Sequence, residues 1–199
     1  MAVAIRLAKD DDAEAVREVY APFCRESPIT FEVEPPAVEE MRLRIGTAYV
    51  QAKPWLVAEE DGRLMGFAHA TRYRERAAYR WSVETSVYVA AGWRRCGVGR
   101  GLYTSLLAIL TLQGYVNAYA AITLPNDPSV GLHEAMGFRL VGTFRHVGYK
   151  AGAWHDVGVW HLMLAAPEAE PREPRPLAEA QDILTWDSAL LAGARLIRP

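Results

Sequence analysis

Cysteine is scarce in this 199-residue chain, and long hydrophobic runs are missing. The two cysteines, Cys24 and Cys96, form no CxxC or Cys/His ligand spacing, so they predict neither a metal site nor a disulfide framework, and a reducing cytoplasm is expected. No stretch approaches the ~20 apolar residues of a membrane span. The apolar part of MAVAIRLAKDDD is too short for a secretory signal. We therefore expect a protein that neither enters a membrane nor is exported.

The chain also lacks an excess of charge of one sign. It carries 22 basic and 24 acidic residues, a net charge of −2, which gives no global attraction to nucleic acid or to an anionic membrane. Any anion must therefore be bound by a local cluster of basic residues. Half of the residues are hydrophobic and about a quarter are charged, as is typical of a soluble globular protein.

The length predicts one domain with an appendage. From Ala165 the composition shifts to prolines among glutamates and arginines, which indicates an extended linker. We therefore expect a domain at residues 1–166, followed by a Pro-rich linker and a possible amphipathic helix within 167–199. That helix either docks on the domain or on a partner, or it remains a frayed tail.

Hydrophobic periodicity predicts an alternation of strands and helices. The three aspartates at 10–12 are expected to cap the first helix, and Asp61-Gly62 is expected to form a tight hairpin turn. In chain order we expect a strand at 2–7, helices through 16–23 and 38–49, strands at 55–59, 64–71 and 81–89, a helix through 102–110, a strand at 117–122, a short helix ending at Gly137, and strands at 140–147 and 157–164.

The strand WSVETSVYV, residues 81–89, has two unlike faces. Side chains alternate along a strand, so Val83, Thr85 and Val87 share one face, whereas Glu84 and Tyr88 share the other. The first face is expected to pack, and the second offers chemistry.

The turn after this strand carries arginines and three glycines. In RRCGVGRG, residues 94–101, glycines leave backbone N–H groups free to converge on an anion at the positive end of the next helix. The spacing fits neither a Walker A loop nor the GxGxxG of dinucleotide folds, so a pyrophosphate of another carrier is indicated. The alternative is that the glycines merely permit a turn.

The Arg-x-x-Gly-x-Gly pattern resembles the coenzyme A signature of the GNAT N-acetyltransferases, and the segment from Asn126 to HEAMGF at 133–138 resembles their second block. The segments ETSVYVAAGWRRCGVGRGLY, LPNDPSV, HEAMGF and AGAWHDVGVW are similar to those of the phosphinothricin and methionine sulfoximine acetyltransferases. The resemblance implies an α/β fold with a mixed central β-sheet splayed at its middle and helices on both faces. It also implies acetyl-CoA in the split and a homodimer. No metal is expected, because the sequence shows no metal ligand set and amide transfer from a thioester needs none.

The resemblance further assigns residues to the cofactor. It implies that the backbone of the strand end binds the pantetheine and thioester, that the glycine-rich turn binds the pyrophosphate, and that an asparagine contributes from the next strand. The residues so implied are Val87, Tyr88, Val89, Arg95, Cys96, Gly97, Val98, Gly99, Arg100, Gly101 and Asn126.

Acetyl transfer to an amine needs a proton acceptor, donors for a developing oxyanion and an acid for the leaving thiolate. Glu84 is the expected general base, although a glutamate on a strand face can also be simply solvated. A backbone N–H near Tyr88–Val89 is the expected oxyanion donor. His133 lies where many GNAT enzymes have a tyrosine; it is a candidate acid or a packing residue, with Tyr88 as the rival acid.

Arginines and tyrosines at residues 72–80 suit a small amino acid with a second anionic group, because guanidinium groups bind carboxylate and phosphinate oxygens. A solvated arginine loop is the alternative. The resemblance places Phe31, Arg74, Arg76, Tyr79 and Tyr88 around such a substrate. The expected reaction is acetylation of phosphinothricin, methionine sulfoximine or methionine sulfone; the alternatives are another amine or a protein N-terminus, or a non-catalytic acyl-CoA-binding module.

Overall fold

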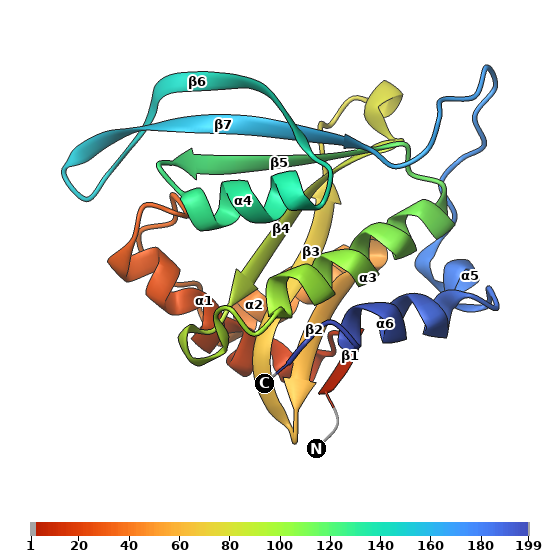
Figure 1. The fold of residues 1–199 in the computed structure, drawn as a ribbon, viewed down its shortest axis with the longest axis horizontal. Coiled ribbons are helices and arrows are strands. Elements are labelled where there is room, and N and C mark those ends of the chain that lie inside the picture. The colour runs from red at the N-terminus through yellow and green to blue at the C-terminus, as the bar shows by residue number, and fades with distance from the viewer. Residues whose placement is uncertain (1–2, 199) are drawn as a thin grey trace.

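The structure is a computed structural model that describes residues 3–198. Seven strands form one mixed sheet in the order β1-β2-β3-β4-β5-β7-β6 (Figure 1). The strands are β1 Val3–Leu7, β2 Trp55–Glu60, β3 Arg63–Arg72, β4 Ser82–Val89, β5 Asn117–Leu124, β6 Arg139–Lys150 and β7 Ala153–Met163. The helices are α1 Ala13–Glu26, α2 Val38–Val50, α3 Val98–Gln113, α4 Asp127–Ala135, α5 Leu177–Gln181 and α6 Trp186–Ala194.

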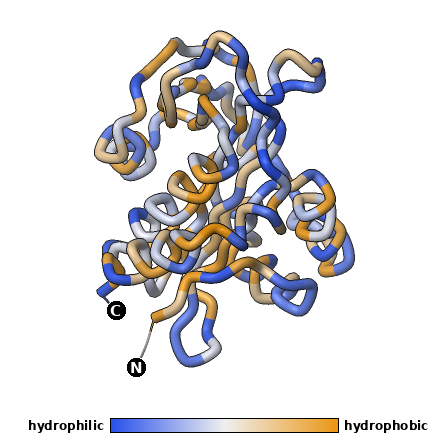
Figure 2. The backbone as a smooth tube through the Cα atoms, turned by 90° about the vertical axis from the view of Figure 1, so that its right-hand side faces the viewer, coloured by the Kyte–Doolittle hydropathy of each residue, from blue (hydrophilic) through white to orange (hydrophobic). Residues whose placement is uncertain are grey.

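Helices cover both faces of the sheet, as the resemblance implies. On one face, α1 and α2 bury Val16 and Ile45 against Phe67 of β3. On the other face, α3 buries Leu102 and Leu106 against β2, β3 and β4. The hydrophobic stretches of the chain lie mostly in the interior and the hydrophilic stretches in outer loops (Figure 2). Burial of apolar area on both faces is the main force that holds the layers together.

The sheet is split at its middle. β4 pairs with β5 in parallel only from Ser82↔Asn117 to Glu84↔Tyr119, whereas β3 follows β4 as far as Gly66↔Val89. The last five residues of β4 therefore have a partner strand on one side only. This confirms the predicted splayed sheet, and it places the start of the split at Glu84.

The hairpin turn predicted between β2 and β3 is confirmed, with Asp61 at φ 49° and Gly62 at φ 76°.

The first helix begins differently from the sequence-based prediction. The aspartates at 10–12 form a 3₁₀ turn, and Asp12 makes no capping hydrogen bond to α1. Its carboxylate accepts from Lys9 N at 2.7 Å and pairs with Arg6 at 2.6 Å. The ion pair with Arg6 occupies the oxygens that a cap would use.

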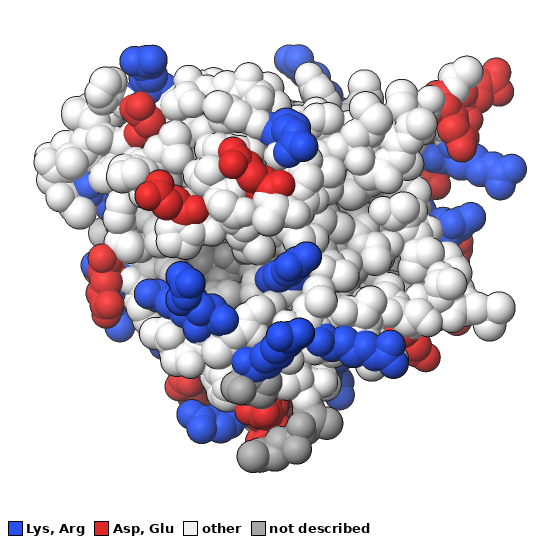
Figure 3. All heavy atoms as spheres, viewed as in Figure 1, with Lys and Arg blue, Asp and Glu red and all other residues white. Residues whose placement is uncertain are grey.

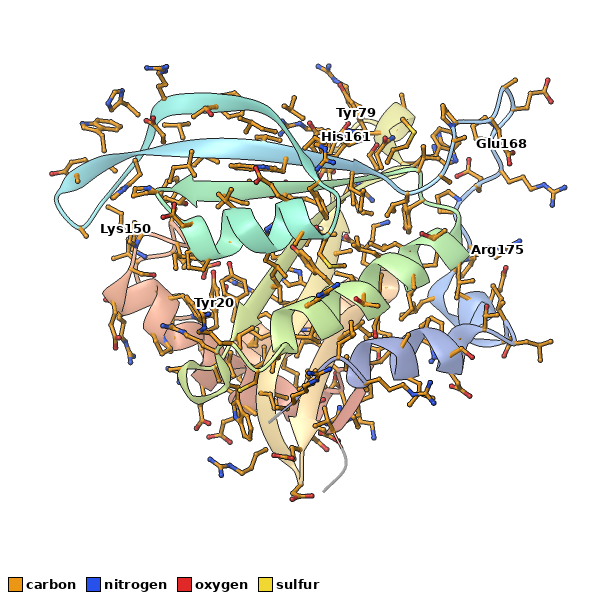
Figure 4. The ribbon with its side chains drawn as sticks, in the orientation of Figure 1. Tyr20, Tyr79, Lys150, His161, Glu168 and Arg175 are labelled. Atoms are coloured by element: carbon orange, nitrogen blue, oxygen red, sulfur yellow. The ribbon has the colours of Figure 1, made fainter. Side chains whose placement is uncertain are left out.

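The last two strands are longer than predicted and form an edge hairpin. β6 is exposed on both faces and has irregular register near Gly142 and Gly148, so its alternation is weak in the sequence. At its far end the buried Lys150 donates through Nζ to Thr30 O at 2.7 Å and Glu32 O at 2.8 Å (Figure 4). The hairpin is thus tied to the segment between α1 and α2.

After β7 the chain returns to α3. The helices α5 and α6 pack on α3, and residue 198 lies near the start of that helix (Figure 1). Leu177, Trp186 and Ile197 are buried there. Among the described residues, no helix has both the length and the apolar character needed to cross a membrane.

Candidate active site

Glu84 lies in a cavity at the point where β4 leaves β5. The cavity has a volume of about 470 Å³, and its walls include Arg74, Tyr73, Tyr119 and residues of the β6–β7 hairpin. Burial raises the pKa of Glu84 above its ordinary value, and the nearby Arg74 charge opposes part of that rise. A carboxyl group in this setting exchanges a proton closer to neutrality than a solvated glutamate does.

The loop at residues 72–80 separates its arginines into two kinds. Arg72 pairs with Glu75 at 3.0 Å, and Arg80 pairs with Glu173. Within residues 3–198, neither Arg74 nor Arg76 forms an ion pair, and the Arg74 guanidinium lies 4.8 Å from the centre of the Tyr73 ring. Two of the four guanidinium groups are therefore free to meet an anion.

Tyrosines order this loop against the sheet. Tyr73 stacks on Tyr119 of β5 with ring centres 4.1 Å apart, and Tyr79 meets Tyr73 edge-on at 5.9 Å. Tyr79 is 42% exposed. The structure thus brings Arg74 and Tyr79 to the side of the sheet that holds Glu84. Tyr119 was not selected from the sequence, although alternation along β5 places it on the face shared with Asn117.

Two other expected substrate residues lie away from this cavity. Tyr88 borders a second cavity of about 500 Å³ beneath α2 and packs edge-on against Tyr20, with ring centres 4.8 Å apart. Burial raises the pKa of Tyr88 to about 12, so its hydroxyl is protonated at neutral pH. Phe31 lies over Gly148 at the far end of the hairpin and borders neither cavity.

The second cavity contains groups that the sequence did not indicate. Trp55 and His69 stack there at 4.2 Å, and neither Trp55 Nε1 nor His69 Nδ1 has a hydrogen-bond partner among the described residues. Burial lowers the pKa of His69 to about 4, so this ring is neutral. Only contact between β2 and β3 brings the two rings together.

The backbone of β4 presents free groups to the split. Ala90 N donates to Met65 O at 2.9 Å, and ladder bonds alternate in direction along an antiparallel strand. The N–H and C=O groups of Val87 and Val89 therefore face the split. The Tyr88 carbonyl oxygen, in contrast, lies close to Gly66 and faces β3 rather than the split. Of the three β4 residues that the resemblance assigns to the cofactor, Val87 and Val89 can offer backbone groups in the split.

The turn before α3 has the conformation of an anion site. Arg95 and Gly97 both have positive φ, 65° and 82°, and the first intrahelical bond runs from Gly101 N to Gly97 O at 2.8 Å. The N–H groups of residues 98–100 therefore have no partner within the helix. Basic side chains border a hollow on this face of the molecule (Figure 3). These free donors and charges fit a pyrophosphate group.

Asn126 is the N-cap residue of α4, and His133 lies within that helix. Asn126 caps the helix, because its Oδ1 accepts from Ser129 N at 3.3 Å. His133 is buried; its Nδ1 lies 2.7 Å from Ser129 O, and its Nε2 lies 2.9 Å from the Tyr103 hydroxyl. A carbonyl can only accept, so Nδ1 carries the proton and Nε2 accepts from Tyr103. Tyr103 was not predicted, since its contact with His133 joins two separate helices.

Comparisons with known proteins agree with this architecture. A family profile described as "Acetyltransferase (GNAT) domain" matches residues 5–159. A phosphinothricin N-acetyltransferase of Streptomyces viridochromogenes is 42% identical over 180 residues, which cover 89% of this chain and 96% of that protein. An L-methionine sulfoximine/L-methionine sulfone acetyltransferase of Pseudomonas aeruginosa is 30% identical and covers 86% of this chain and all of that protein.

The fold is shared with solved structures. The crystal structure of a GNAT superfamily phosphinothricin acetyltransferase from Sinorhizobium meliloti, in complex with acetyl-CoA, superposes with a TM-score of 0.83 and 32% identity over 89% of this chain and 97% of that chain. The chain belongs to the GNAT acetyltransferases and is an acetyl-CoA-dependent N-acetyltransferase. Within that superfamily it groups with the phosphinothricin and methionine sulfoximine acetyltransferases.

Proposed function

We propose that this enzyme acetylates the α-amine of a small anionic amino acid, such as phosphinothricin, methionine sulfoximine or methionine sulfone. The observation that carries the proposal is the half-buried Glu84 facing the unpaired Arg74 in a cavity at the opening of the split sheet. A volume near 470 Å³ is suited to a small molecule. The names of the relatives support the same class of acceptor.

In the proposed reaction, Glu84 takes the proton of the incoming ammonium group, directly or through a water molecule. Its raised pKa makes the carboxylate a stronger base than a solvated glutamate, and the Arg74 charge opposes part of that rise. No hydrogen bond within the described residues occupies the carboxylate. Glu84 is therefore free to receive a proton from a ligand.

The acceptor's anionic groups would be bound by the free guanidinium groups of Arg74 and Arg76. Fixed forks of N–H donors match carboxylate and phosphinate oxygens. Tyr79 would close the cavity from the loop. We keep Tyr88 and Phe31 as proposed substrate contacts, Tyr88 from the neighbouring cavity and Phe31 from the segment that Lys150 holds against the hairpin.

Acetyl-CoA supplies the activated acetyl thioester. The backbone groups of Val87 and Val89 that face the split would hold its pantetheine arm. The Val89 N–H would donate to the carbonyl oxygen of the acetyl thioester. The turn at 94–101 would hold the pyrophosphate. Asn126 Nδ2 is left free by the helix cap and would donate from the other side of the split.

Two groups are candidates for the acid that protonates the leaving thiolate. Tyr88 carries a proton at neutral pH, whereas both ring nitrogens of His133 are occupied by Ser129 and Tyr103. These contacts favour Tyr88 as the acid and His133 as the residue that positions Tyr103. A Tyr88→Phe variant that retains full turnover would exclude Tyr88 as the acid and would favour His133 in that role.

We further propose that the enzyme is a homodimer formed through the β6–β7 hairpin. Large apolar side chains are exposed along it: Leu140, Val141, Phe144, Val147, Tyr149, Trp154 and Met163. Val141 and Phe144 also line the Glu84 cavity, so a second copy on this surface would close that cavity. Sedimentation velocity should show a dimer for the wild type and a monomer for Phe144→Asp; a monomeric wild type would refute this proposal. A cytoplasmic location remains a prediction.

The reaction is tested by mixing the purified protein with acetyl-CoA and separate amino acids and following free thiol. Saturable thiol release is expected with phosphinothricin, methionine sulfoximine or methionine sulfone, and much less with ordinary amino acids. If only another amine or a peptide is acetylated, the acceptor assignment is wrong. If acetyl-CoA binds and no acceptor is acetylated, the chain is a binding module.

A further inference from the structure

The C-terminal segment runs back along α3 to the turn that precedes this helix. It begins at the C-terminal end of α3, where Arg175 N donates to Gln113 O at 2.7 Å (Figure 4). Midway, Ser105 Oγ donates to Ala189 O at 2.9 Å. At the other end, Arg198 N donates to Cys96 O at 2.8 Å. The segment therefore spans the helix and ends on the phosphate-binding turn.

Two glycines of that turn are in close contact with the segment. A Cβ atom on Gly101 would lie 2.6 Å from Gly193 O, and one on Gly97 would lie 2.3 Å from Leu196 O. Any side chain there would force the segment away. Glycine is therefore needed at these two positions for two reasons. It leaves room for the docked C-terminal segment, and it allows the turn to present free N–H groups to an anion.

The same contacts bring another arginine to the turn. Among residues 3–198, the side chains of Arg94, Arg95, Arg100 and Arg198 form no ion pair with a carboxylate, although the chain as a whole has a net charge of −2. The first three belong to the turn and the first turn of α3. The fourth is held beside Cys96 by its own backbone. Unpaired positive charge gathered at a helix N-terminus favours a polyanion.

We propose that residues 196–198 are part of the acetyl-CoA site. The segment fixes Cys96 and Gly97 in the conformation that presents free N–H groups, and Arg198 supplies a guanidinium group to the phosphates of the coenzyme. This rests on acetyl-CoA binding at the turn, as proposed above. The segment lies beyond residue 159, where the match to the family profile ends, so this contribution is an addition to the shared domain.

The first test measures binding, without turnover, by isothermal titration calorimetry with CoA and with 3′-dephospho-CoA. Arg198→Ala should weaken CoA about fivefold, as expected for loss of one charge-assisted contact in a partly solvated site. An equal loss for both ligands assigns Arg198 to the pyrophosphate, and a loss for CoA alone assigns it to the 3′-phosphate. The loss should shrink at high salt.

Arg172→Ala is the matched control, because it removes the same charge from the linker, where Arg172 O accepts from Trp81 Nε1 near the start of β4. Equal CoA affinity of Arg198→Ala and Arg172→Ala would overturn the proposal. A wild type that binds no CoA would instead refute the proposed function of the turn.

The docking itself is tested with Gly193→Ala. Its Cβ would lie 2.2 Å from both Gly101 O and Ser105 Oγ, so α6 must move off α3. CoA affinity should fall at least as much as in Arg198→Ala, with the KM for the acceptor amine unchanged. Gly46→Ala, where a Cβ meets nothing within 4 Å, is the control in another helix. CoA affinity equal to that of the control would contradict the proposal.

Discussion

Replacing Glu84 by glutamine should separate catalysis from stability. Glutamine has nearly the same shape, and no described residue bonds to the carboxylate, so the cavity should keep its form. The variant loses the proton acceptor, and general-base catalysis typically contributes 10²–10⁴-fold. We therefore expect kcat to fall by roughly 10²–10⁴, about 3–5 kcal/mol of activation free energy.

The same substitution should stabilise the fold at neutral pH. Burial raises the pKa of Glu84, so the folded protein holds this proton more tightly than the unfolded chain. The free energy of unfolding therefore falls as pH rises from the ordinary glutamate pKa through the pKa of Glu84 in the folded protein. Above that second pKa, the buried charged carboxylate destabilises the fold. Glutamine removes that cost. Urea unfolding should show Glu84→Gln more stable than the wild type at pH 7.5, with the difference vanishing below about pH 4.

Steady-state thiol release and urea unfolding on the same preparations provide both measurements. Glu75→Gln is the control, since that side chain is exposed and pairs with Arg72 on the same loop. It should change neither kcat nor stability by much. A Glu84→Gln enzyme that keeps more than about a tenth of the wild-type kcat would refute the base assignment. A loss of stability would refute the electrostatic argument.

Three other outcomes follow from the site. Arg74→Gln removes the charge that lowers the pKa of Glu84, so the acidic limb of the kcat/KM profile should move to higher pH; an unmoved limb would contradict their proximity. Tyr103→Phe leaves His133 Nε2 buried without a donor and should cost about 1–3 kcal/mol in urea unfolding; a change below measurement error would exclude this bond. Burial lowers the pKa of His133, so the unfolded chain takes up this proton first, and stability should fall as pH drops through about 6.5. His133→Phe should make that slope shallower between pH 7.5 and 5.5 without removing it, because the lowered pKa of His69 contributes over the same range; an unchanged slope would contradict the lowered pKa of His133.

Local patterns were sufficient for most elements and for part of the site. Alternation along residues 81–89 placed Glu84 opposite the buried Val83 and Thr85, as observed. The hairpin at Asp61-Gly62 and the glycine-rich turn depend on backbone angles that few residues adopt, so their sequences were distinctive. These features are encoded within a few neighbouring residues.

Pairing between distant segments determined the rest. The split opens at Glu84 because β5 stops pairing with β4 at Tyr119, which is far from Glu84 along the chain. Arg80 is paired because Glu173, far along in the linker, reaches it, whereas no carboxylate of the described residues forms an ion pair with Arg74. The sequence by itself therefore determined the elements, the family and the type of chemistry. Only the tertiary structure decided which arginines remain unpaired, which ring atoms of His133 are occupied, and that the C-terminal segment docks on the glycine-rich turn before α3, because each depends on long-range packing that no local pattern records.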